Sequence, residues 1–121
     1  MARTHFERLV AEALDSLPED ILQHMDNVEV IVEDWPSRAQ MARAGLGPGY
    51  TLFGLYEGVP LTKRSSSYGL VPPDKITIFR GPIEVTYTDE DERRRCVVRT
   101  VIHEIAHHFG LDEDRLQELG L

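Results

Sequence analysis

Apolar residues near the amino terminus recur every three or four positions, which is the spacing of an amphipathic helix. Between Thr4 and Leu17 this pattern comprises Phe6, Leu9, Val10, Ala13, Leu14 and Leu17. We therefore expect a helix over these residues, with one side packed into a core. Pro18 ends or restarts that helix, and a short second helix is expected from Pro18 to Met25.

Farther along the chain the pattern changes to strict alternation, which is the spacing of a half-buried strand. It predicts a first strand from Val28 to Val32, with its valines on one face, a second from Thr51 to Tyr56 and a third from Lys75 to Arg80. After the third strand, Gly81-Pro82 is expected to end the pairing. The alternation of Ile83, Val85 and Tyr87 is too short to define a fourth strand.

Further elements are marked by capping and turn residues. Ser37 is a suitable cap for a short helix through Ala44, and a glycine-rich loop follows it. Glu57-Gly58 suggests a turn, from which Val59-Pro60-Leu61 can pair back as a short arm that Pro60 restricts to a sheet edge.

A long helix is expected to begin at Thr88, with Asp91 three residues on as an acidic capping box, and to end at Gly110. Its core-facing side is predicted to carry Cys96, Val97, Val101, Ile105 and Phe109. The element order as a whole is that of an α+β fold.

Length and composition are consistent with one domain over residues 1–121 and a single core. The single cysteine, Cys96, cannot form an internal disulfide, and we interpret it as a small buried residue. A formal net charge of −8 argues against a nucleic-acid partner. The first ten residues do not form a secretory signal and no stretch reaches membrane-spanning length, so we expect a cytoplasmic protein.

The chemistry concentrates in one segment of the long helix, His103-Glu104-Ile105-Ala106-His107. Residues four apart lie on the same helix face, so His103 and His107 can direct two imidazoles at one metal ion. Glu104 is placed to take a proton from a water that Zn²⁺ has acidified. The neighbouring His108 points about 100° away around the helix, which favours a surface or supporting position.

A catalytic zinc site needs a third protein ligand and an open position. Gly110 can reverse the chain after the helix because glycine adopts positive φ at low cost. The acidic run Asp112, Glu113 and Asp114 then comes within range of the metal, and the geometry alone leaves the choice among these three carboxylates open.

The pattern His-Glu-x-x-His-x-x-Gly-x-x-Glu, which ends at Glu113, resembles the extended zincin signature. The string HEIAHHFGLDEDRL in so short a chain is similar to the bacterial minimal zincin-like metallopeptidases. That resemblance implies one small zincin-like domain in which a twisted mixed sheet of three to four strands packs on a long active-site helix, with additional helices. It also implies His103, His107 and Glu113 as zinc ligands and Glu104 as the general base.

In such folds an edge strand aligns an extended peptide over the metal, and here the strand around Thr77 to Phe79 or the arm Val59 to Leu61 is the candidate. The sequence therefore predicts a zinc-dependent metallopeptidase, or a peptidase-like hydrolase, that acts on a peptide or protein. The alternative is a non-catalytic, metal-stabilised module that binds a peptide or regulates a partner. Substrate, native metal and oligomeric state are not determined by the sequence.

Overall fold

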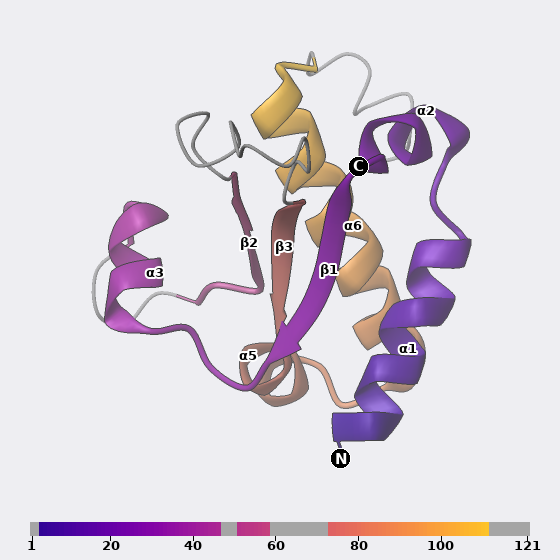
Figure 1. The fold of residues 1–121 in the computed structure, drawn as a ribbon. Coiled ribbons are helices and arrows are strands. Elements are labelled where there is room, and N and C mark those ends of the chain that lie inside the picture. Colours follow the sequence, from indigo (N-terminus) through magenta and orange to yellow (C-terminus); the bar gives the residue numbers. More distant parts are fainter. Residues whose placement is uncertain (1–2, 47–50, 59–72, 112–121) are drawn as a thin grey trace.

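A three-stranded sheet with helices packed around it forms the part of the chain that the computed structural model describes, namely residues 3–46, 51–58 and 73–111 (Figure 1). The elements in chain order are α1 (Arg3–Asp15), α2 (Glu19–Leu22), the 3-10 turn η1 (Gln23–Met25), β1 (Val28–Glu33), α3 (Arg38–Arg43), β2 (Gly54–Glu57), β3 (Asp74–Phe79), α5 (Arg80–Thr86) and α6 (Glu90–Phe109). The architecture is α+β and mixed, as the sequence predicts.

The strands lie in the order β1-β3-β2, with β1 parallel and β2 antiparallel to the central β3. The prediction that the strand around Thr77 to Phe79 is an edge is therefore wrong. Residues 76 to 79 are all fully buried, because a central strand is covered on both faces. The predicted arm from Val59 to Leu61 lies outside the described residues.

One face of the sheet packs against helices α1 and α6; in Figure 1, α6 passes behind the strands and α1 lies beside α6, to the right of β1. The register places Val30 beside Ile76 and Ile76 beside Tyr56, so these side chains share that face. The helices contribute buried residues to the same core, among them Phe6, Leu9, Val10, Ala13, Val97, Val101 and Ile105. The predicted inward sides of both helices are thus confirmed, with Phe109 as an exception.

Phe109 is 43% exposed, so its assignment to the core side of α6 is wrong. It is the last residue of the helix, beyond the end of the sheet contact, and its ring packs against His24 with centroids 4.8 Å apart. Ile102 and Ala106 are buried as well, so the core-facing side of α6 is wider than the pattern predicts.

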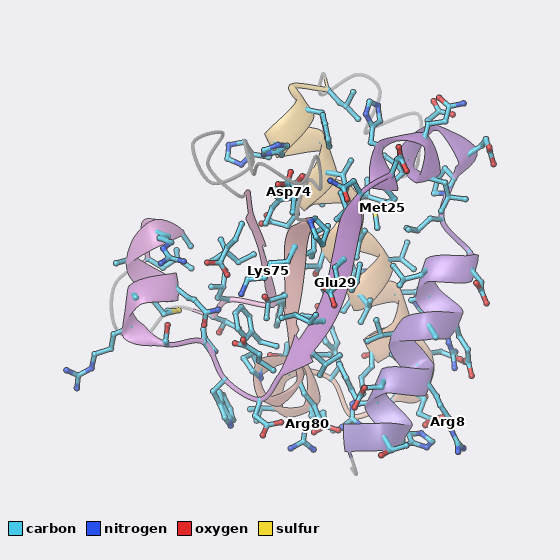
Figure 2. The ribbon with its side chains drawn as sticks, in the orientation of Figure 1. Arg8, Met25, Glu29, Asp74, Lys75 and Arg80 are labelled. Atoms are coloured by element: carbon cyan, nitrogen blue, oxygen red, sulfur yellow. The ribbon has the colours of Figure 1, made fainter. Side chains whose placement is uncertain are left out.

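The opposite face of the sheet carries charged side chains. Glu29 and Lys75 are register partners on β1 and β3 and lie near each other in Figure 2. On the same face, Gln40 of α3 donates hydrogen bonds to the carboxylates of Glu33 and Glu57, at 3.3 and 3.4 Å. Helix α3 is thereby joined to both β1 and β2.

Helix boundaries follow the capping residues closely. Ser37 caps α3 as predicted, and it forms a full capping box with Gln40. Helix α6 is capped by Asp89, whose Oδ2 accepts the N–H of Glu92 at 3.1 Å, so the predicted start at Thr88 is wrong by one residue. Gly110 ends α6 with φ 68°, a left-handed conformation that glycine adopts without a Cβ penalty.

Two segments differ from the predicted strands. Strand β2 begins at Gly54 and not at Thr51. The segment after β3 is helix α5, although its alternation had left a fourth strand open. Pro82 lies in the first turn of α5, where the missing N–H has no helical partner to lose, so proline begins a helix here as well as ending a strand. Ile83 is buried whereas Val85 is 74% exposed.

None of the helices in residues 3–46, 51–58 and 73–111 is long and apolar enough to cross a bilayer.

Candidate metal centre

The two histidines of the candidate site lie one turn apart on α6 and are both exposed. Val101 and Ile105 on the same helix are fully buried. The metal-facing side and the core-facing side of α6 are therefore distinct, and His103 and His107 are accessible to an ion from solvent.

Glu104 lies between these histidines in sequence and turns toward the sheet. Its Oε1 accepts a hydrogen bond from the backbone N–H of Tyr56 on β2, at 2.6 Å. Burial raises the pKa of Glu104 above its ordinary value, while the hydrogen bond from Tyr56 and the charges of His107 and His103 act in the opposite direction. The carboxylate is thus held at the junction of helix and strand. Sequence patterns did not reveal Tyr56 as its partner, because the two residues are 48 positions apart.

Gly54 allows β2 to lie this close to α6. A Cβ at this position would be 2.5 Å from Thr100 Cγ2 and 3.0 Å from the backbone oxygen of Thr77. Both separations are shorter than ordinary van der Waals contact. A residue without a side chain is therefore required where the strand crosses the helix, one turn before the candidate metal ligands.

Two hollows meet at Gly54 and Glu104. The first, of about 280 Å³, is also lined by Phe53, Tyr87, Cys96, Arg99, Thr100 and His103. The second, of about 540 Å³, is also lined by Arg43, Ala44, Leu46, Leu52, Leu55, Tyr56, His107 and His108. His103 therefore borders the first hollow and His107 the second, and Glu104 borders both.

His108, next to the second candidate ligand, stacks on the ring of Tyr56 with centroids 3.9 Å apart. Its Nε2 lies 4.0 Å from Asp74 Oδ2, and the Tyr56 hydroxyl donates to the same carboxylate oxygen. His108 therefore takes part in a cluster beside the site. The phenol of Tyr56 points at Asp74, while its backbone N–H serves Glu104.

The acidic residues predicted to complete the metal shell, Asp112, Glu113 and Asp114, lie outside the described residues. In the part of the chain that the structure describes, no three His, Cys, Asp or Glu side chains come together as a metal site. The described portion supplies two exposed imidazoles on one helix face and a held carboxylate beside them. That donor set fits half of a tetrahedral zinc shell together with its base.

Comparison with known proteins gives a family model described as zincin-like metallopeptidase, which matches residues 25–121. Among solved structures, the chain is similar to a conserved hypothetical protein from T. thermophilus, with a TM-score of 0.57 and 21% sequence identity over 90% of this chain and 94% of that one. At this identity the likeness shows a shared fold only. No curated protein matches the sequence significantly.

Proposed function

The chain belongs to the zincin-like metallopeptidase family, and from this premise we propose that it is a zinc-dependent peptidase that hydrolyses a peptide or protein substrate. The observation that supports this best is the position of Glu104. Its carboxylate is held by the N–H of Tyr56, lies beside two exposed histidines and separates two hollows. A general base must stand next to both the metal and the substrate, and this residue borders the space for each.

His103 and His107 would hold the zinc ion, with an acidic residue after Gly110 as third ligand, for which Glu113 is the best candidate. A zinc ion there would supply Lewis-acid polarisation of the attacking water and of the scissile carbonyl. Glu104 takes the proton of that water and delivers it to the leaving amine nitrogen. The hydrogen bond from Tyr56 keeps the carboxylate aimed at this space, so no reorientation is needed between the two proton transfers.

The proposed substrate is a peptide because its extended backbone can lie along the crossing of β2 and α6, with side chains in the hollows on either side of Glu104. A nucleic-acid substrate is disfavoured by the net charge of −8. We also propose that the protein is located in the cytoplasm.

The test compares wild type with Glu104→Gln, both loaded with the same amount of zinc, on a mixed peptide library. Glu92→Gln is the matched control, because it makes the same change at an exposed position of the same helix. We expect one zinc per chain in all three proteins, and cleavage at least ~100-fold slower in Glu104→Gln alone, the usual contribution of a general base.

The alternative function is a metal-stabilised module that binds a peptide without cutting it. Bound zinc with no cleavage by wild type would favour that module. Absence of bound zinc in wild type would contradict both functions, since each depends on the same two histidines.

A further inference from the structure

A positive charge lies in the first hollow, next to the candidate reaction centre. Arg99 is four residues before His103 on α6, so the two side chains lie one above the other on the same helix face. Arg99 lines the hollow of about 280 Å³ that His103 and Glu104 also border. A group bound to its guanidinium would therefore lie on the same side of α6 as the candidate metal position.

The charge of Arg99 is not neutralised within the described residues. Four other arginines each form an ion pair with a carboxylate, namely Arg43, Arg80, Arg93 and Arg94. Arg99 instead donates to the neutral hydroxyl of Tyr87, at 3.4 Å. A chain with 21 acidic residues thus keeps one guanidinium of this hollow without an acidic partner among the residues described.

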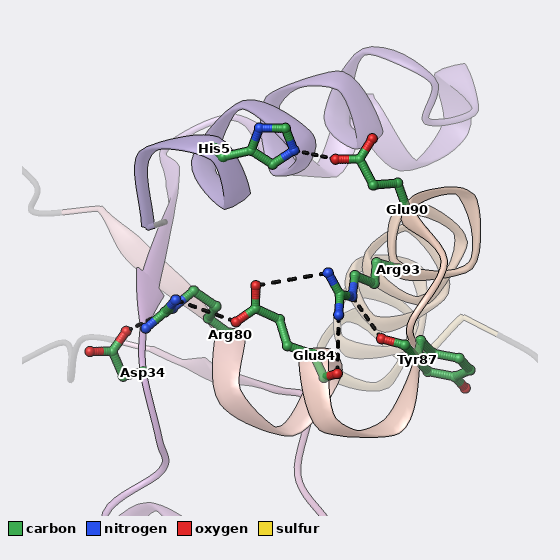
Figure 3. Close-up of polar contacts among 7 residues, drawn as sticks. All are labelled: His5, Asp34, Arg80, Glu84, Tyr87, Glu90 and Arg93. Atoms are coloured by element: carbon green, nitrogen blue, oxygen red, sulfur yellow. Dashed lines mark hydrogen bonds and ion pairs between the residues drawn. The ribbon is translucent and has the colours of Figure 1, made fainter. Parts of the chain in front are cut away.

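Tyr87 is fixed in position beside Arg99. Its carbonyl accepts a hydrogen bond from Arg93 Nε at 2.7 Å, and Arg93 also contacts the carboxylate of Glu84 at 4.0 Å (Figure 3). Its ring packs against Phe53, with centroids 6.0 Å apart. The hydroxyl is therefore a second hydrogen-bond donor next to the guanidinium. Together the two groups can donate to both oxygens of one carboxylate.

The two hollows beside Glu104 differ in charge. In the second hollow Arg43 forms an ion pair with Glu57, so its charge is compensated. The lining of the first hollow includes the apolar ring of Phe53 and the buried Cys96. A carboxylate is the natural partner for a guanidinium in such partly desolvated surroundings.

We propose that the hollow formed by Arg99 and Tyr87 is a specificity pocket that binds a carboxylate of the substrate on one side of the scissile bond. The carboxylate belongs either to an Asp or Glu side chain or to the free carboxyl terminus of the peptide. This inference rests on the proposed peptidase function. The net negative charge of the protein repels acidic peptides, so a local positive charge such as that of Arg99 is needed to favour them over neutral ones.

The experiment uses two peptide pairs around a common cleavage site. In the first pair Glu is replaced by Gln, at each flanking position in turn; in the second the free carboxyl terminus is replaced by an amide. We expect wild type to prefer the acid member of one pair by about tenfold in kcat/KM, the effect of one charge-assisted contact. The first pair identifies a side chain as ligand, and the second identifies the carboxyl terminus.

Arg99→Gln should reduce this preference to about onefold, because kcat/KM should fall more for the acid peptide than for the neutral one. Arg99→Lys should retain part of the preference, and Tyr87→Phe should weaken it by a smaller factor. Arg95→Gln is the control, because it removes the same charge from an exposed position of α6. A wild type with no preference, or an Arg99→Gln protein that keeps it, overturns the proposal.

Failure of the peptidase function itself is distinguishable. Loss of cleavage in Glu104→Gln on the neutral peptide tests the hydrolase, whereas the acid-to-neutral ratio tests the pocket. If wild type cleaves neither peptide, binding of both pairs to zinc-loaded Glu104→Gln is measured by fluorescence anisotropy, with and without Arg99→Gln. Tighter binding of the acid peptide that depends on Arg99 supports the pocket, and equal or absent binding overturns it.

Discussion

Replacing Gly54 by alanine is the change that most directly tests how strand β2 meets helix α6. The new Cβ would be 2.5 Å from Thr100 Cγ2, whereas carbon atoms normally approach to about 3.5–4.0 Å. Strand and helix must therefore separate by about 1 Å at this point, unless Thr100 changes rotamer. The backbone oxygen of Thr77, 3.0 Å from the same Cβ, limits movement in the other direction.

The expected cost follows from the size of this clash. Overpacking by one methyl group costs about 1–3 kcal/mol. Alanine in place of glycine in an unstrained strand would by contrast stabilise the protein by about 0.5–1 kcal/mol. We therefore expect Gly54→Ala to lower the free energy of unfolding by about 1–2 kcal/mol, which is a decrease of roughly 1 M in the urea midpoint for a small domain.

The assay is urea denaturation of wild type, Gly54→Ala, Thr100→Ser and the double variant. Serine lacks Cγ2, so the double variant should recover about 1 kcal/mol relative to the sum of the single changes. Recovery should be incomplete because the Thr77 contact persists. A Gly54→Ala protein at least as stable as wild type, or single effects that simply add, would refute the close approach of β2 to α6.

Three further predictions concern the metal ligands, a helix cap and the buried thiol. Alanine at His103 or His107 should abolish retention of zinc after dialysis, whereas His108→Ala should retain it; equal metal content in all three would contradict the ligand assignment. Asp89→Ala should reduce the free energy of unfolding by about 1 kcal/mol through loss of the α6 cap, and an unchanged urea midpoint would argue against that role. Burial raises the pKa of the Cys96 thiol above its ordinary value of 9.0, so the unfolded chain loses this proton first and stability should fall as pH rises past that value. Thermal unfolding between about pH 8 and pH 10 should show a shallower alkaline decline for Cys96→Ala than for wild type; identical slopes would disprove the linkage.

Local signals in the sequence predicted the helices well. The three- and four-residue spacing of Phe6, Leu9 and Val10 identified α1 and its buried side. Ser37 and Gly110 marked helix ends, because capping depends on hydrogen bonds between residues three to five positions apart. Such features are properties of short segments and do not depend on the rest of the fold.

Predictions that needed distant partners were less successful. The strand around Thr77 was assigned to an edge, although β1 and β2 flank it on both sides. Phe109 fits the helical period but lies past the end of the core that α6 covers. The alternation after β3 resembled a strand, yet α5 forms there, and the N–H of Gly81 is bonded to the carbonyl of Asp34 at 2.8 Å. In each case the outcome depends on what packs against the segment.

For the candidate site, the sequence by itself determined that His103, Glu104 and His107 share a helix, since their relative placement follows from 3.6 residues per turn. Only the tertiary structure decided what surrounds them. It joined Tyr56 to Glu104, brought Gly54 against the helix and placed Arg99 and Tyr87 in the lining of one hollow. Contacts between residues far apart in the chain depend on how the sheet packs on α6, and helical periodicity carries no information about that packing.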